Sequence, residues 1–154
     1  MSLTGYSPGT FAGYVSGAGA DAVDCDVRVE VTLSGGRIEL SFTAQFPASA
    51  DPLLQADLAR PQAVRIRREI ERALQASRPV PAIPLGTFPG TYSVAGEGTA
   101  TVAVELKLRG GGNHVALVAR TERESGAELV IETRLDTEAG VGLEGHLERL
   151  TQQL

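Results

Sequence analysis

The sequence contains no tryptophan, a single cysteine (Cys25) and a single lysine (Lys107), and aromatic residues make up only 5% of its 154 residues. One cysteine excludes an internal disulfide, which agrees with a reducing compartment, so we expect a cytoplasmic protein. The shortage of aromatic rings disfavours a protein that stacks on nucleic-acid bases. No apolar run approaches the roughly 20 residues of a membrane-spanning helix, so we expect no membrane span.

The length and composition of the chain fit one soluble domain covering residues 1–154. Hydrophobic residues make up 42% and charged residues 21%, which is typical of a globular chain with one core. The net charge of −5 is unevenly distributed: residues 60–78 contain six arginines and two glutamates, and residues 122–154 contain eight acidic residues and three arginines. We expect these basic and acidic segments to dock on each other, within or between subunits.

The clearest local pattern is a β-hairpin over residues 24–34 and 37–46. Apolar residues alternate with polar ones in both segments, which predicts two strands that each have one core face and one wet face. The Gly35-Gly36 pair between them suits a two-residue turn with positive φ angles. The predicted register places Val29 opposite Phe42, Leu33 opposite Ile38 and Cys25 opposite Phe46.

Similar alternation predicts strands over most of the remaining chain, including 102–108, "HVALVARTE", "AELVIETRLD" and "VGLEGHLERL". With "GTFAGYVS" and "IPLGTFPGTYSV" the count is about eight. The exception is "RPQAVRIRREIERALQAS", where Ala63, Ile66, Ile70, Ala73 and Leu74 recur at helical spacing. We therefore predict an α+β fold: about eight mostly antiparallel strands in a barrel or strongly curved sheet, with one amphipathic helix packed on it.

An internal duplication is a further hypothesis. "PGTF" at residues 8–11 recurs as "PGTY" at 89–92, and the alternating segments that follow are alike. The offset changes from 81 to 75 between these matches, so an insertion has to be assumed. The predicted repeats are residues 8–46 and 89–122.

Residues with chemical potential are few. If "VGLEGHLERL" is a strand, Glu144, His146 and Glu148 project from one face and form either a metal or acid/base site or a solvated polar face; the second interpretation is favoured because no other ligand cluster accompanies them. Cys25 belongs to the apolar face of its strand and is interpreted as a structural thiol. We expect no metal and no cofactor.

The segment "GTFAG" followed by "VRVEVTLSGGRI" resembles the opening hairpin of domains that bind flavin mononucleotide covalently. The resemblance covers about 35 residues. The Ser-Gly-Ala-Thr attachment motif of that family does not occur in this chain. No flavin and no site residue are inferred from it.

Three functions are consistent with these observations. We favour a non-catalytic assembly or protein-interaction subunit that self-associates, with interface candidates Arg65, Arg68, Arg72, Glu144 and Glu148. The alternative is a small β-barrel that binds an apolar molecule, with ligand-binding candidates Tyr14, Tyr92, Arg28 and Glu30. Such a barrel could also be an enzyme of the cyclase or isomerase kind, because those reactions need a shaped pocket and few polar groups, with no recognisable motif.

Overall fold

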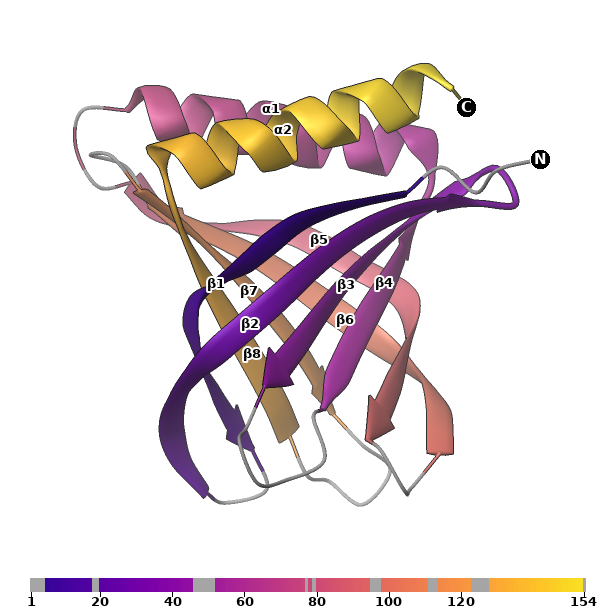
Figure 1. The fold of residues 1–154 in the computed structure, drawn as a ribbon, viewed down its shortest axis with the longest axis vertical. Coiled ribbons are helices and arrows are strands. Elements are labelled where there is room, and N and C mark those ends of the chain that lie inside the picture. Colours follow the sequence, from indigo (N-terminus) through magenta and orange to yellow (C-terminus); the bar gives the residue numbers. More distant parts are fainter. Residues whose placement is uncertain are drawn as a thin grey trace.

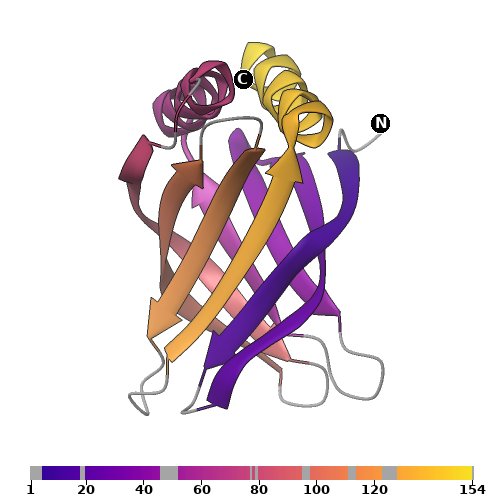
Figure 2. The ribbon, with the colours of Figure 1, turned by 90° about the vertical axis from the view of Figure 1, so that its left-hand side faces the viewer.

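The part of the chain described by the computed structural model forms a closed, eight-stranded antiparallel barrel with two helices across one end (Figures 1 and 2). The structure describes residues 5–17, 20–45, 52–76, 78, 80–94, 98–110, 114–122 and 128–153. The elements in chain order are β1 (Gly5–Gly17), β2 (Ala20–Ser34), β3 (Arg37–Gln45), β4 (Leu53–Leu58), α1 (Arg60–Gln75), β5 (Val80–Val94), β6 (Gly98–Gly110), β7 (His114–Glu122), β8 (Glu128–Asp136) and α2 (Thr137–Gln152). The predicted α+β class with about eight strands is confirmed.

The interior of the barrel is filled by apolar side chains. Inward-facing residues such as Val29, Phe42, Leu54, Leu106 and Ile131 are all 0% exposed. An eight-stranded barrel is just wide enough for its inward side chains to fill it. A void that holds one water molecule would leave accessible area on the side chains that line it. These side chains have none, so the part of the interior that they line is dry and closed.

The β2–β3 hairpin has the predicted register. Val29 pairs with Phe42, Val31 with Leu40 and Leu33 with Ile38. Gly35 and Gly36 form the turn with φ angles of 58° and 80°, which a residue with a Cβ atom rarely adopts. Cys25 is half-buried, and the predicted pairing of Cys25 with Phe46 lies outside the described residues.

The predicted helix is α1, and its apolar face lies on the end of the barrel. Ala63, Ile66, Ile70 and Ala73 are buried, as the spacing of these residues predicts. The helix begins after Ala59, whose backbone N–H donates to Gln62 Oε1 at 2.8 Å. Because this hydrogen bond satisfies an amide that would otherwise lack a partner, it helps to fix the helix start.

The sequence pattern predicts a strand at "VGLEGHLERL", and this prediction is wrong. The segment is part of a second helix, α2. Its Leu143, Leu147 and Leu150 are three or four residues apart and buried, and Asp136 Oδ1 accepts from the Ala139 backbone N–H at 2.8 Å as the N-cap. The eighth strand is instead β4, a short segment before α1 that the alternation did not reveal. The helices run antiparallel across the barrel end (Figure 1).

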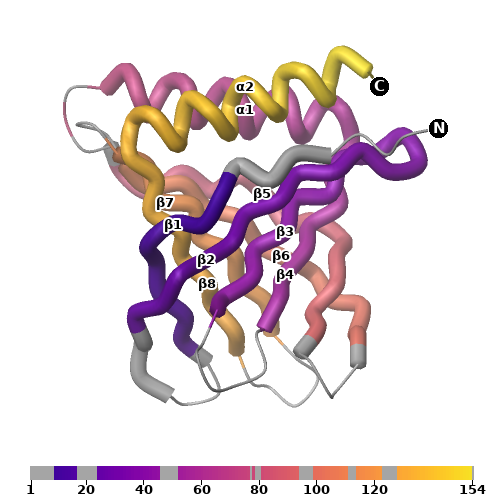
Figure 3. Tube along the Cα trace, in the orientation of Figure 1, coloured from indigo at the N-terminus to yellow at the C-terminus, as the bar shows by residue number. Residues whose placement is uncertain are grey.

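The two halves of the chain have the same architecture. Each consists of four strands followed by a helix, as the colours along the trace in Figure 3 show. The helix ranges Arg60–Gln75 and Thr137–Gln152 are 77 residues apart at both ends, and so are β3 and β7. The pairing that closes the barrel repeats as well: Gly13 lies opposite Thr133 at one seam, and Gly90 lies opposite Ala56 at the other.

Glycines mark this correspondence at the residue level. "GTFAG" at 9–13 matches "GTFPG" at 86–90, and Gly9 and Gly86 have positive φ angles of 136° and 126°. A Cβ atom on Gly13 would lie 2.1 Å from the Glu132 carbonyl oxygen, and one on Gly90 would lie 2.0 Å from the Gln55 carbonyl oxygen. The offset is therefore constant at 77, and no insertion is needed. A duplication remains a hypothesis, but this is the pattern that a simple duplication predicts.

Candidate functional site

The predicted ligand-binding residues do not form one site. Arg28 and Glu30 lie on the outer wall of the barrel, where their side chains form a partly exposed ion pair of 3.2 Å. Tyr14 is half-buried on the same outer wall, whereas Tyr92 is buried in the apolar core. The two tyrosines therefore lie on opposite sides of the sheet and cannot bind the same molecule.

The most polar buried cluster lies at the β1–β8 seam and centres on Glu132. Its side chain is 3% exposed although it belongs to the outer face of the sheet. Tyr14 Oη donates to Glu132 Oε1 at 3.3 Å, Arg134 Nε to Oε2 at 3.4 Å, and Arg109 forms an ion pair with Oε1. The Arg134 guanidinium also lies 5.6 Å from the centroid of the Tyr14 ring. Two cations and a hydroxyl thus compensate the buried carboxylate.

Within the part of the chain that the structure describes, this polar cluster has no counterpart at the equivalent β4–β5 seam. The residues that correspond to Tyr14 and Glu132 at the β4–β5 seam are Thr91 and Gln55, which are uncharged. A surface groove of about 450 Å³ lies beside the cluster, with Arg134, Asp24, Cys25 and Asp26 in its lining. Sequence reasoning did not identify Glu132 or its arginines, because each occupies an ordinary polar position of an alternating strand.

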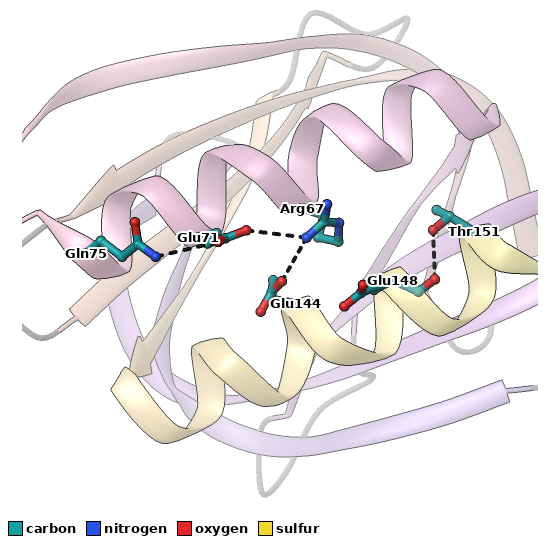
Figure 4. Close-up of polar contacts among 6 residues, drawn as sticks. All are labelled: Arg67, Glu71, Gln75, Glu144, Glu148 and Thr151. Carbon is teal, nitrogen blue, oxygen red and sulfur yellow. Dashed lines mark hydrogen bonds and ion pairs between the residues drawn. The ribbon is translucent and has the colours of Figure 1, made fainter.

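The basic and acidic segments do dock on each other, but through two helices and not through a helix and a sheet. Arg67 of α1 lies between two carboxylates: its NH1 is 3.0 Å from Glu144 Oε1 of α2 and 3.3 Å from Glu71 Oε2 (Figure 4). The side chains of Arg67 and Glu144 are only 19% and 17% exposed. Glu144 is thus used inside the chain, and Arg67, which was not among the predicted interface residues, is its partner.

The other predicted interface residues differ in their availability. Arg65 is held by the barrel, because its NH1 and NH2 donate to the carbonyl oxygens of Leu85 at 2.9 Å and Pro84 at 3.1 Å. Arg68 and Glu148 are exposed. Arg72 is 75% exposed and 3.5 Å from Glu69. The exposed residues of this set therefore lie on the helix-covered end.

A concave notch lies between α2 and β1. Its volume is about 310 Å³, and Phe11, Asp136, Glu138, Gly142 and His146 are among the residues that line it. Burial and the positive charge of Arg149 lower the pKa of the His146 imidazole below its usual 6.5. Because the segment is helical, Glu144, His146 and Glu148 do not share a face: Glu144 contacts α1, and His146 lines the notch.

The described residues offer no metal site, since they contain no group of three or more His, Cys, Asp or Glu side chains placed to hold an ion. Among the described helices, none is long and apolar enough to cross a membrane. Comparison with known proteins finds no matching family model, no matching curated protein and no matching solved structure.

Proposed function

We propose that this protein is a non-catalytic, cytoplasmic protein-interaction subunit that self-associates through the barrel end covered by α1 and α2. The observation that carries the proposal is the filled interior. Small β-barrels bind apolar molecules inside the barrel, and the inward side chains described above leave no room there. The closed part of the interior therefore supports binding at the outer surface.

The helix-covered end has the features of such a surface. Arg68 and Arg72 of α1 and Glu148 of α2 are exposed, and Val141 of α2 is a large hydrophobic side chain with 52% exposure. The helices are antiparallel and differ in charge. A second copy rotated by 180° can therefore place its basic α1 near the acidic residues of α2, which is the self-complementary arrangement that a two-fold dimer requires.

The alternative function, a barrel that binds an apolar molecule or catalyses a cyclase- or isomerase-type reaction, has less support. Its candidates Tyr14 and Tyr92 lie on opposite faces of the sheet, and Arg28 is paired with Glu30 on the outer wall. No observation on the described residues favours this alternative over association.

Light scattering coupled to size-exclusion chromatography tests the proposal over a range of protein and salt concentrations. We expect a concentration-dependent dimer that Arg68→Glu/Arg72→Glu weakens by at least about tenfold, because both changes place negative charge opposite an acidic helix. The matched control is Arg28→Glu/Lys107→Glu, which changes the net charge equally on the barrel wall. A strict monomer at every concentration, or an equal effect of the control, would contradict the proposal.

A further inference from the structure

The strongest clue to a partner is a difference between the two halves of the chain. In the first half, Arg65 of α1 reaches over the edge of the barrel and its guanidinium donates to the carbonyl oxygens of Leu85 and Pro84. These carbonyls belong to a bulge where the β5–β6 register shifts. Phe88, two residues beyond the bulge, is only 4% exposed. The first half thus holds an arginine of its own at this edge of the barrel.

In the second half the position 77 residues after Arg65 is Gly142, and there the notch is open. A Cβ atom added to Gly142 would have no neighbouring atom within 4 Å. Phe11, the counterpart of Phe88, is only half-buried, and it lines the open volume together with Gly142. The cavity therefore lies where the side chain of Arg65 lies in the other half.

The acceptors that hold Arg65 have counterparts in the second half. The β1–β2 register shifts between Tyr6 and Gly9, so residues 7 and 8 lie at a bulge that corresponds, by the offset of 77, to the bulge at Pro84 and Leu85. The second notch also has two carboxylates, Asp136 and Glu138, at positions that are Ala59 and Pro61 in the first half. These acidic residues favour a cation in the open notch.

We propose that the notch at Gly142 binds the guanidinium group of an arginine side chain from a partner protein, in the way that the first half binds its own Arg65. The inference rests on the proposed interaction function and names the chemistry of the contact. A planar guanidinium can donate two parallel hydrogen bonds to a pair of carbonyl oxygens, which a lysine ammonium does less well. The aliphatic stem of the arginine would lie on the accessible part of Phe11.

Nuclear magnetic resonance of the full chain tests the site with blocked arginine (N-acetyl-arginine N-methylamide) as the probe. We expect saturable shifts at Phe11 and His146, and binding of blocked lysine that is weaker by at least about tenfold. Gly142→Arg should abolish the shifts, because the new side chain fills the notch. Gly145→Arg is the matched control, since position 145 on the same helix is equally open and should leave binding unchanged.

A second variant keeps the test independent of how Gly142→Arg folds. Glu138 is exposed, and Glu138→Gln removes one charge of the notch, so it should weaken binding of blocked arginine. Absence of saturable shifts, equal binding of arginine and lysine, or unchanged binding by Gly142→Arg would each overturn the proposal.

The oligomeric state of Gly142→Arg identifies the source of the arginine. If that variant no longer self-associates, the arginine comes from a second copy, with exposed Arg68 and Arg72 as the donors to test. If it associates like the parent chain and the parent binds blocked arginine, the arginine comes from a different protein. A chain that is monomeric but binds blocked arginine contradicts only self-association, and a chain that associates without binding it contradicts only the notch.

Discussion

Arg67 and Glu144 occupy equivalent positions in the two halves of the chain, 77 residues apart, and they form an ion pair of 3.0 Å between α1 and α2. The two equivalent positions therefore meet where α1 and α2 pack on each other. Two identical residues there would place like charges together. Because one position is an arginine and the other a glutamate, the two halves attract each other at this contact.

Charge exchange tests this pair. Arg67→Glu should lower the free energy of unfolding by about 1–2 kcal/mol, because it places a third carboxylate beside Glu71 and Glu144 in a partly buried position. The exchange Arg67→Glu/Glu144→Arg should recover more than half of that loss. Urea unfolding of the variants gives the values, and an exchange variant no more stable than Arg67→Glu would show that the pair does not join the helices.

A substitution at Thr133 is expected to stabilise the protein. It is 0% exposed inside the barrel, and its Oγ1 has no hydrogen-bond partner. Thr133→Val keeps the shape and removes the buried hydroxyl, so we expect about 1 kcal/mol of added stability. Thr121→Val is the matched control: Thr121 Oγ1 donates to the Ala103 carbonyl at 2.7 Å, and loss of that bond should cost about 1 kcal/mol. Thermal unfolding should show opposite shifts for the two variants.

A side chain added at Gly13 is expected to destabilise the barrel strongly, because there is no space for it. A Cβ atom there would lie 2.1 Å from the Glu132 carbonyl oxygen and 2.9 Å from Val27 Cγ2. Gly13→Ala should therefore destabilise the barrel by about 3 kcal/mol or more, because the closing seam has to open. Gly142→Ala adds the same methyl group to open space in a helix and should stabilise by about 0.5–1 kcal/mol. Equal urea midpoints for the two variants would contradict this account.

The polar contacts of Glu132 are expected to stabilise the same β1–β8 seam. Glu132→Gln replaces the charge-assisted contacts of the buried carboxylate with Arg109 and Arg134 by weaker ones, and we expect a loss of about 2 kcal/mol in the free energy of unfolding. Glu128→Gln is the control. It removes an exposed carboxylate, whose pKa is lowered mainly by its hydrogen bond from Arg120, and should leave the urea midpoint nearly unchanged.

The titration of His146 is expected to make the stability of the protein depend on pH. Its pKa is lowered in the folded chain, by burial first and then by Arg149, while the unfolded chain has the usual value of 6.5. Between the two pKa values the unfolded chain binds more protons, so this contribution is complete above pH 6.5 and is lost as the pH falls through that window. His146→Gln should flatten the urea midpoint between pH 7.5 and 5.5, roughly the window of histidine titration. A parallel curve for the variant would exclude His146 as the cause.

The hairpin and α1 could be predicted because several local signals agree in them. Gly35-Gly36 fixes the turn, and strict alternation around it fixes the faces. In α2 the signals conflict: Gly140, Gly142 and Gly145 lower helix propensity, and Val141, Leu143 and Leu147 also fit a period of two. Packing against α1 decides in favour of the helix. β4 was missed because it is only six residues long, although Leu54, Ala56 and Leu58 alternate with Gln55 and Asp57.

The candidate site was harder to predict than the fold. The notch exists because Gly142 has no side chain, so no functional group in the sequence indicates a binding site there. The signal that could have located it is the repeat: with "GTFAG" aligned on "GTFPG", and not "PGTF" on "PGTY", Arg65 falls opposite Gly142. The seam cluster around Glu132 had no such signal, because its members come from three strands that only closure of the barrel brings together.

Closure of the barrel also decides how this chain can meet other molecules. Each described strand is hydrogen-bonded to a neighbour on both sides, β1 to β2 and β8, and β5 to β4 and β6. A sheet with free edges can extend by adding a strand from another chain, which often leads to aggregation. Here the two seams are paired only in part, β1 with β8 over Gly13–Gly17 and β5 with β4 over Gly90–Ser93. The backbone groups that a partner could use are therefore concentrated in the stretches of β1 and β5 that precede these segments.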